Sequence, residues 1–372
     1  MNKCDIIVTY CWNRVGYNII RSLYDKGVKV VVGDISKWNI CSMSKYSIDS
    51  FTYSDPKNDE KGFIKDIKNA LNKYNPKVLM PTHDEALIIA KHIEELPDNI
   101  VYAMESYETQ YKLSDKYQAT VLAKEAGVPT PAFIKDFEHH SYPICIKTKF
   151  GNSAKGVFFP KSYKEAQTIL SKYDECEVLV EEFFEGHDFS VDCVRYGDFF
   201  KASTYRSLVT KTDGGGTTTQ RELVSMPDLE KYSKMLLDYV GYKGVCGIDW
   251  KVNEQSGNAV FIEVNARFTG GLATPMAGGF DIPGVVYELF TKGIYTTPIE
   301  IKIGTKTKWI LGDIIALVTK IIGRTLKKSE LKQILSWDFD AFDDFRKEDA
   351  KAIIGEFLYY FIKLVKNRKL NP

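Results

Sequence analysis

Two neighbouring runs in the second half of the chain predict a β-hairpin. Residues 245–252 and 260–265 are typical of strands, and the Asn, Ser and Gly residues between them are typical of a turn. Side chains alternate between the faces of a strand, so Glu263 and Asn265 share one face, and pairing the runs sets Asp249 roughly opposite Glu263. Three oxygen-bearing side chains then converge, as in sites for hard cations such as Mg²⁺. The alternative is an ordinary half-solvated hairpin with exposed charges.

Size and composition limit the class of protein. At 372 residues, 44% of them hydrophobic, the chain is expected to form two or three domains. Lys and Arg number 50 and Asp and Glu 49, so no bulk charge points to a nucleic acid partner. The seven cysteines are scattered and never spaced as C-x-x-C, which argues against a disulfide framework or a structural zinc site. Without a signal-like or membrane-length apolar run, we expect a cytoplasmic location.

Residues 1–112 alternate short apolar runs with helical patterns, which predicts a parallel sheet covered on both faces. Such sheets bind ligands beyond the carboxyl ends of their strands. The side chains expected there are Asn13, Arg14 and Gly16 in one loop and Thr82, His83 and Asp84 in another. G-x-G-x-x-G is absent, so a dinucleotide is not predicted. His83 is either a general base or, as we favour, a structural hydrogen-bonding residue.

The next segment contains a weaker phosphate-binding signal. Ser114 or Asp115 can cap a helix that ends at Gly127, and residues 144–147 form a short strand ending in Lys147. The loop that follows carries Gly151, Ser153, Lys155 and Gly156. It can turn backbone N–H groups and an ammonium toward phosphates, although a hairpin without a ligand is equally compatible with it.

The run that begins at Glu177 predicts a buried strand, followed by a carboxylate cluster and a turn. Glu181, Glu182 and Glu185 lie close together in the sequence, which is costly unless positive or donor-rich groups meet them. A strand that runs into a turn also leaves backbone N–H and C=O groups able to contact the edge of a base.

With the Lys147 strand, the Glu181 turn and the Asp249, Glu263 and Asn265 hairpin in this order, the chain resembles the ATP-grasp superfamily. The resemblance is closest to the branch containing the carbamoyl phosphate synthetase large subunit, biotin carboxylase and many carboxylate–amine ligases, and it covers most of residues 1 to about 295. It implies a mixed α/β and α+β protein. An N-terminal parallel α/β domain (1–112) would precede a two-lobed ATP-grasp domain (113–297, hinge near 181–186) and a helical C-terminal extension (298–372).

The resemblance also implies roles for individual residues. Groups expected to bind ATP are Lys116, Lys147, Gly151, Ser153, Lys155 and Gly156 near the phosphates, Glu181 and the Phe184 N–H at adenine, and Asp188 at the ribose. Asp249, Glu263 and Asn265 match the ligands of two Mg²⁺ ions, with Mn²⁺ as a substitute, and Arg267 matches an arginine near the transferred phosphoryl group. Lys147 and Arg267 are the implied catalytic residues. Asp188 and Asp249 stand where the family often has the longer Glu.

The implied reaction is ATP-dependent joining of a small-molecule carboxylate to an amine. Phosphoryl transfer to the carboxylate gives an acyl phosphate, which the amine converts to an amide as ADP and phosphate are released. Residues 211–221, with Arg206, Lys211 and Arg221 as anion contacts, are predicted to be a mobile flap or, alternatively, a surface hairpin. Other functions left open are a bicarbonate-using carboxylase, disfavoured because residues 149–156 lack a polyglycine run, and a non-catalytic ATP-binding module.

The C-terminal part differs in character. Residues 309–324 and 356–369 are apolar with basic residues behind them, which is compatible with helices lying on a membrane. We favour packing against the parent domain or a sister subunit, as in a homodimer. Residues 336–348 are acidic and aromatic and are predicted to be a loop or short helix.

Overall fold

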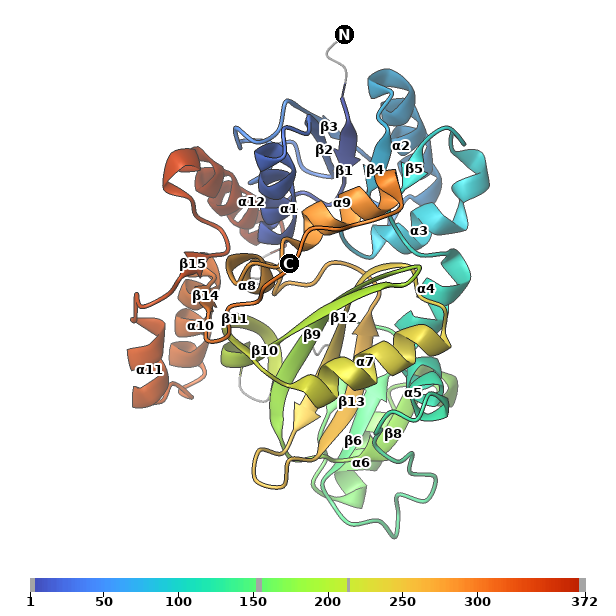
Figure 1. The fold of residues 1–372 in the computed structure, drawn as a ribbon. Coiled ribbons are helices and arrows are strands. Elements are labelled where there is room, and N and C mark those ends of the chain that lie inside the picture. The colour runs from blue at the N-terminus through green and yellow to red at the C-terminus, as the bar shows by residue number, and fades with distance from the viewer. Residues whose placement is uncertain (1–3, 152–155, 213–214, 368–372) are drawn as a thin grey trace.

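The N-terminal sheet consists of five parallel strands in the order β3-β2-β1-β4-β5, as the βα alternation predicts. The computed structural model describes residues 4–151, 156–212 and 215–367 (Figure 1). The strands are β1 (Ile6–Val8), β2 (Val30–Asp34), β3 (Asp49–Thr52), β4 (Val78–Met80) and β5 (Val101–Tyr102). The accompanying helices are α1 (Arg14–Asp25), α2 (Glu60–Tyr74), α3 (Glu85–Lys91), a 3-10 turn η1 (Ile93–Glu95) and α4 (Tyr107–Ser114).

One face of this sheet is covered by a helix that comes from far along the chain. Helix α9 (Ile282–Lys292) buries Ile282, Val285 and Leu289 in the same core as Ile6 and Val8 of β1. Helix α1 contributes to this core, whereas α2 and α3 pack on the other face. In Figure 1, α9 lies between the N-terminal sheet and the large sheet below it. The N-terminal domain therefore includes a segment well beyond residue 112.

Helix boundaries follow from capping side chains. Asn13 accepts hydrogen bonds from the N–H groups of Val15 and Gly16 and begins α1. Asp115 caps α5 (Lys116–Glu125) in the same way, as predicted, and Gly127 with φ 77° follows the end of that helix.

A small lobe is built on three antiparallel strands in the order β7-β6-β8. They are β6 (Ile144–Thr148), β7 (Val157–Phe158) and β8 (Val178–Glu182), accompanied by α6 (Tyr163–Leu170) and the 3-10 turn η2 (Glu175–Glu177). Its fully buried core contains Ile144, Ile146 and Ala166, surrounded by half-buried apolar side chains.

The second lobe is built on a seven-stranded sheet in the order β13-β12-β9-β10-β11-β14-β15. The strands are β9 (His187–Tyr196), β10 (Phe199–Thr212), β11 (Gly215–Val224), β12 (Gly244–Val252), β13 (Ala259–Asn265), β14 (Lys306–Lys308) and β15 (Ala341–Phe342). Helices α5 and α7 (Pro227–Tyr239) pack on it around Trp250 and Phe261, and the short α8 (Ala273–Ala277) follows β13. The Asp249–Glu263 register is as predicted.

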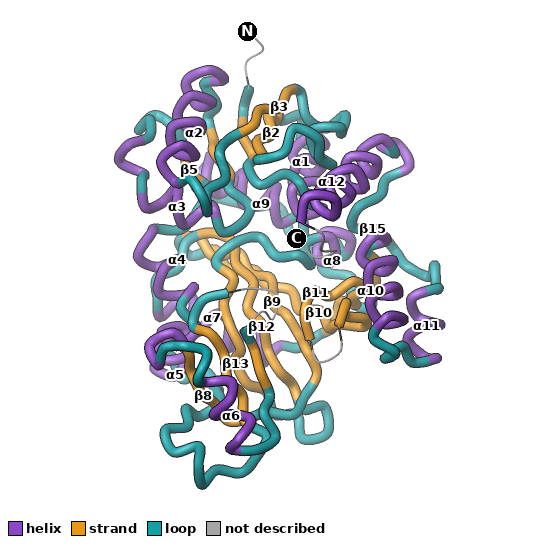
Figure 2. Tube along the Cα trace, turned by 180° about the vertical axis from the view of Figure 1, so that it is seen from behind, coloured by secondary structure: helices purple, strands orange, loops and turns teal. Residues whose placement is uncertain are grey.

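The C-terminal segment extends this sheet instead of standing apart. Strand β14 pairs with β11, and β15 pairs with β14. The remaining elements are α10 (Ile310–Ile322), α11 (Lys328–Ile334), the 3-10 turn η3 (Lys347–Asp349) and α12 (Lys351–Asn367). Figure 2 shows α10 and α11 beside the edge of the large sheet and α12 beside the N-terminal domain. The strand at Ala341–Phe342 replaces part of the predicted loop or short helix.

Both long C-terminal helices pack against the rest of the chain, as we favoured, but each leaves apolar residues exposed. In α12, Tyr359 is buried and stacks on Trp12, whereas Phe361 is exposed. In α10, Ile315 is buried and Ile322 exposed. Among the described residues, no helix has the length and hydropathy needed to span a bilayer. Contact of these faces with a membrane or a second subunit remains a prediction.

Candidate functional site

The β12–β13 hairpin brings the three predicted metal ligands together. Asp249 and Glu263 are direct partners across the two strands, and Asn265 Nδ2 donates a hydrogen bond to Asp249 Oδ2 at 3.1 Å. Ser190 Oγ, from β9, donates to Asp249 Oδ1 at 2.5 Å. Burial, with the nearby charge of Glu263, raises the pKa of Asp249 to about 7. Two carboxylates held this close favour a cation between them, so the donor set fits a hard divalent ion.

The protein alone supplies an incomplete shell for such an ion. No group of three or more His, Cys, Asp or Glu side chains suited to a metal occurs in the part of the chain that the structure describes. Mg²⁺ usually keeps waters and substrate phosphates in its shell, so two carboxylates and one amide oxygen match its ordinary use in phosphate-binding sites.

A buried lysine joins this hairpin to the predicted phosphate loop. Lys116, the first residue of α5, places its Nζ 2.6 Å from the carbonyl oxygen of Gly151 and 3.2 Å from Glu263 Oε2. Gly151 and Gly156 flank the predicted loop with positive φ angles of 135° and 81°. Ser153 and Lys155 fall outside the described residues. Lys116 therefore carries positive charge to the point where a predicted metal ligand, Glu263, and the first residue of the predicted loop, Gly151, lie close together.

The second predicted lysine lies on the small lobe and pairs with the predicted adenine-binding residue. Cys145 faces Glu181 across β6 and β8, so Lys147, two residues on, reaches Glu181 diagonally. The distance from Lys147 Nζ to Glu181 Oε2 is 2.6 Å. Burial alone would lower the pKa of Lys147, but Glu181 and, more weakly, Glu263 reverse the effect and raise it. Glu263, a predicted metal ligand, therefore acts on the charge of Lys147 as well as contacting Lys116.

Glu181 retains an unused acceptor. Its side chain is 1% exposed, and its Oε1 has no hydrogen-bond partner among the described residues. A buried carboxylate oxygen without a donor is unfavourable, which fits a site for an amino group of a ligand. Phe184 lies in the connection that follows β8, where its N–H is not part of a strand.

Asp188 lies at the start of β9 and is tied to a neighbouring strand. Its Oδ1 is 2.8 Å from the Nζ of Lys251, which also donates to the carbonyl oxygen of Gly186. A Cβ on Gly186 would lie 2.6 Å from the carbonyl oxygen of Val252, so the tight connection between the lobes requires glycine here. The proposed ribose contact would have to share Asp188 with Lys251.

Arg267 lies just after β13 and contacts the N-terminal domain. Its Nε donates to Asp84 Oδ1 at 2.9 Å, and its Nη1 donates to the carbonyl oxygen of Phe268 at 3.2 Å. Asp84 belongs to the loop after β4, one of the two loops predicted to carry ligand contacts. His83 in the same loop stacks on Tyr10 at a centroid distance of 4.3 Å, an arrangement that favours the structural interpretation of this histidine.

The predicted flap is a long hairpin whose cationic residues are already engaged. Arg206 forms two hydrogen bonds to Glu222, and Lys211 lies over the ring of Trp309 at 4.3 Å. Arg221 is 1% exposed and reaches Asp343 Oδ2 at 2.8 Å. Strand β11 pairs with β14 through residues 220–222, so this half of the segment is a fixed strand and not a free flap. Residues 213–214 lie outside the described part.

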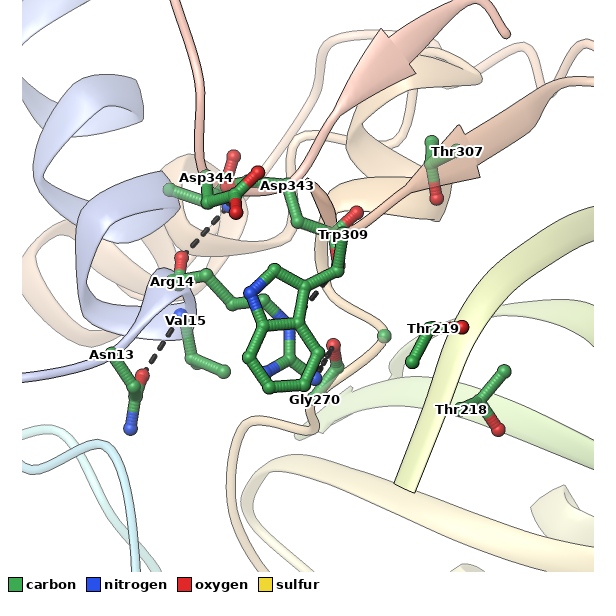
Figure 3. Close-up of polar contacts among 12 residues, drawn as sticks. Asn13, Arg14, Val15, Thr218, Thr219, Gly270, Thr307, Trp309, Asp343 and Asp344 are labelled. Carbon is green, nitrogen blue, oxygen red and sulfur yellow. Dashed lines mark hydrogen bonds and ion pairs between the residues drawn. The ribbon is translucent and has the colours of Figure 1, made fainter. Parts of the chain in front are cut away.

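Sequence analysis did not find the buried cluster that holds Arg221. Arg14 Nε also donates to Asp343 Oδ2, at 3.1 Å, and its guanidinium lies 3.8 Å from the centre of the Trp309 ring (Figure 3). Asp344 accepts from the N–H groups of Ile310 and Leu311 at the start of α10. The only signal in the sequence was the acidic, aromatic segment at residues 336–348, which gave no indication of its partners.

A cavity of about 510 Å³ lies away from these residues. It is lined by residues of β5, α4 and the segment before it, the end of β9, the loop before β12, and α9, among them Tyr102, Glu105, Tyr196, Lys243 and Phe290. None of the residues lining it is a predicted site residue. The chemistry of the hairpin, and not this hollow, therefore defines the candidate site.

The small lobe, the large sheet and the β12–β13 hairpin make up a fold that can be compared with known proteins. Residues 113–271 match the family model of the ATP-grasp domain and form such a domain. In sequence, the chain is similar to the D-alanine–D-alanine ligase of Coprothermobacter proteolyticus, with 26% identity over 179 residues. This match covers 41% of the chain and 58% of the ligase, so the chain spans little more than half of this relative.

Solved structures show the same fold over a larger part of the chain. Biotin carboxylase from Campylobacter jejuni, as a complex with an ATP ligand, has a TM-score of 0.66 and 15% identity, covering 82% of this chain and 74% of that one. The L-amino acid ligase from Bacillus licheniformis has a TM-score of 0.63 and 16% identity, covering 78% and 75%. The predicted fold class is confirmed, and the chain is related to ATP-grasp enzymes.

Proposed function

We propose that this protein is an ADP-forming carboxylate–amine ligase that depends on Mg²⁺. The observation that carries the proposal is the convergence of Asp249, Glu263 and Asn265 with the buried ammonium of Lys116 at the edge of the predicted phosphate loop. Similarity to a D-alanine–D-alanine ligase in sequence and to an L-amino acid ligase in fold supports amide formation as the outcome.

The nucleotide would bind between the two lobes. Glu181 offers its unused Oε1 to the adenine amino group, and the N–H of Phe184 is placed in the adjoining connection. Lys147 and Lys116 supply positive charge for the phosphates, and Asp188 would hold the ribose hydroxyls. Ser153 and Lys155 complete the expected phosphate loop, and that part of the proposal rests on the sequence.

We propose that two Mg²⁺ ions bind at the β12–β13 hairpin, with Mn²⁺ as a substitute. Their protein ligands would be Asp249, Glu263 and Asn265. Bound there, the metal would supply charge neutralisation and alignment of phosphate oxygens. Asn265 donates through its nitrogen to Asp249, so that bond does not use its Oδ1. The like charges of Asp249 and Glu263 would then be offset instead of repelling each other.

The proposed chemistry has two steps. A carboxylate oxygen of the first substrate attacks the γ-phosphorus, and the bond from that phosphorus to the β–γ bridging oxygen breaks, giving an acyl phosphate and ADP. The amine nitrogen of the second substrate attacks the acyl carbon, the carbon–oxygen bond to phosphate breaks, and the nitrogen loses a proton. Arg267 and Lys147 would stabilise the charge on the transferred group, and closure of the small lobe would exclude water.

The test is ADP release from the purified full chain with MgATP and a panel of amino acids and dipeptides, each alone and in pairs. A ligase releases ADP and phosphate in equal amounts only when a suitable carboxylate and amine are both present, and the amide appears by mass spectrometry. If the chain binds no MgATP or MgADP at millimolar concentration, the proposal is wrong.

A second candidate is an ATP-dependent carboxylase that uses bicarbonate. The extent of the fold similarity to biotin carboxylase favours it, whereas the sequence of residues 149–156, which lacks a polyglycine run, does not. Stimulation of phosphate release by bicarbonate, without any amino acid, would select the carboxylase over the ligase.

A further inference from the structure

The segment that follows the metal-binding strand, residues 266–271, is held from three directions. Arg267 is bound by Asp84 from the loop after β4. Thr269 Oγ1 donates to Asp192 Oδ1 of β9 at 2.8 Å. The carbonyl oxygen of Gly270 accepts from Arg14 Nη2, at the start of α1, at 3.1 Å (Figure 3). Two of the three contacts come from loops at the carboxyl ends of N-terminal strands, where an α/β sheet presents its functional groups.

The segment has little room to shift. A Cβ added to Gly271 would lie 2.2 Å from the hydroxyl oxygen of Tyr205, and one added to Gly270 would lie 2.9 Å from Arg14 Nη2. The backbone is therefore packed directly against the large sheet and the N-terminal domain. The side chain of Arg267 extends from this fixed backbone. The direction of its guanidinium group therefore depends on the contacts that the side chain itself makes.

Asp84 is suited to fix that direction. Burial would raise its pKa, but Arg267 and His83 outweigh burial and hold the pKa well below its usual range, so the carboxylate stays charged. Burial and Arg267 together lower the pKa of His83 to about 4, so its ring is neutral at pH 7. The ring lies between the face of Tyr10 and Asp84, with its Nδ1 3.3 Å from Asp84 Oδ1.

The bonds of Arg267 leave one side of its guanidinium for a ligand. Nε is used by Asp84 and Nη1 by the carbonyl oxygen of Phe268. Nη2 makes no hydrogen bond to the described residues. A guanidinium that is held through Nε and Nη1 presents its remaining Nη2 in a defined direction, and a directed guanidinium orients phosphoryl and carboxylate groups.

We propose that Asp84 is a positioning residue through which the N-terminal domain aims Arg267 at the phosphoryl group transferred beside the β12–β13 hairpin. This inference rests on the proposed function, because it needs a nucleotide at that hairpin. It assigns the N-terminal domain a part in phosphoryl transfer that involves no contact between Asp84 and the substrate.

The first test distinguishes an effect of Asp84 on the orientation of Arg267 from effects on folding and on nucleotide binding. Asp84→Asn keeps the shape of the side chain but removes its charge, and Glu60→Gln is the matched control. Glu60 is also a carboxylate of the N-terminal domain and binds Lys91 and His92 at the surface. We expect Asp84→Asn to lower kcat for ADP release about 10- to 100-fold, as a displacement of the order of 1 Å does. The affinity for MgADP and the Tm should match those of the control.

The second test needs no knowledge of the substrates. Binding of MgADP, with and without aluminium fluoride as a mimic of the transferred phosphoryl group, is measured by calorimetry. The wild type should bind the aluminium fluoride complex more tightly than MgADP alone. In Asp84→Asn, the ratio of the affinity for the aluminium fluoride complex to the affinity for MgADP should be about 10-fold smaller than in the wild type. In Asp84→Glu, this ratio should lie between those of Asp84→Asn and the wild type. Once Arg267→Lys has been introduced, adding Asp84→Asn should have little further effect, because the two residues act as a unit.

The outcomes distinguish the two proposals. If the wild type binds neither MgADP nor its aluminium fluoride complex, the proposed function fails and this inference fails with it. If the wild type binds both normally and Asp84→Asn shows the same gain and the same kcat, only the positioning role is overturned. Equal losses of MgADP affinity and Tm in Asp84→Asn would show that Asp84 merely holds the domains together, which also overturns the inference.

Discussion

The two lobes of the ATP-grasp domain differ in how much core supports their functional groups. The three-stranded lobe, with Lys147 and Glu181, has a fully buried core of Ile144, Ile146 and Ala166. The seven-stranded sheet, with Asp249 and Glu263, packs on Trp250, Phe261 and many other buried side chains. Regions with few buried apolar contacts open at lower free energy than regions with many. The difference predicts that the small lobe, with the predicted nucleotide-binding residues, opens more readily than the large sheet, with the predicted metal ligands.

One residue lies between the two parts. Lys116 contacts Glu263 on the large sheet and the carbonyl oxygen of Gly151 in the loop that leaves the small lobe. Its helix, α5, packs on the large sheet. The positive charge is therefore fixed relative to the predicted metal ligands on the large sheet.

The largest effect is expected from breaking the predicted metal site on the large sheet. Glu263→Gln removes one of the two charges, and we expect a loss of ADP release of at least about 100-fold, because changes around metal ligands already cost 10- to 100-fold. Glu254→Gln, in the exposed turn of the same hairpin, is the control and should retain full activity. The measurement is turnover across a Mg²⁺ titration. Full activity of Glu263→Gln would remove the distinction between the lobes.

The stability of the large sheet is also expected to depend on the buried cluster of Arg14, Arg221 and Asp343, which connects it to the C-terminal segment. Asp343→Ala leaves Arg14 and Arg221 buried without their shared carboxylate, and breaking such a buried pair costs about 3–5 kcal/mol. Asp340→Ala, which alters an exposed carboxylate three residues earlier, should cost far less. Urea unfolding measures both variants. Similar losses for the two would show that the cluster does not stabilise this lobe.

A buried carboxylate in the large sheet makes its stability depend on pH. Burial raises the pKa of Asp192 to about 7, above the value of about 4 for an unfolded Asp. The folded state then binds more protons between these values, so this contribution to stability is present at low pH and is lost as pH rises through 7. Asp192→Asn retains an oxygen that can accept a hydrogen bond from Thr269. We expect this variant to reduce the change in the free energy of unfolding between pH 4 and pH 7 by roughly 1–3 kcal/mol. An unchanged profile would show that Asp192 ionises normally.

The smallest expected effect is the loss of stability caused by matched core substitutions in the two lobes. Ile146→Val in the small lobe and Ile248→Val in the large sheet remove the same methylene from side chains that are both 0% exposed, at a cost of about 0.5–1.5 kcal/mol each. Hydrogen exchange should show faster opening confined to β6–β8 for Ile146→Val. For Ile248→Val it should show a loss of global stability. If both variants behave alike, the lobes unfold as one unit.

The parts that sequence predicted are those set by local patterns. Alternation in residues 260–265 and the turn before them place Glu263 opposite Asp249, and Asp115 caps the helix that presents Lys116. These features need only neighbours in sequence. The short strand β3 was missed because Asp49–Thr52 is largely exposed and lacks an apolar pattern.

The parts that could not be predicted depend on distant segments. Arg14 meets Asp343 across 329 residues of sequence, and Arg267 meets Asp84 across 183. The sequence placed Arg221 in a predicted mobile flap, whereas the structure buries it. Its burial depends on Trp309 and Asp343, and no local sequence pattern specifies their positions. Predicted roles that involve bound ATP or Mg²⁺ remain predictions.

The return of α9 to the N-terminal sheet also affects how the chain can fold during synthesis. Ile6 and Val8 are synthesised about 280 residues before the side chains of α9 that cover them. The core of the N-terminal sheet is therefore completed only after residues 282–292 have been made. Until then, one apolar face of the sheet lies open, and contacts between segments so distant in sequence form slowly. We expect this face to be the region most in need of protection from aggregation while the chain is incomplete.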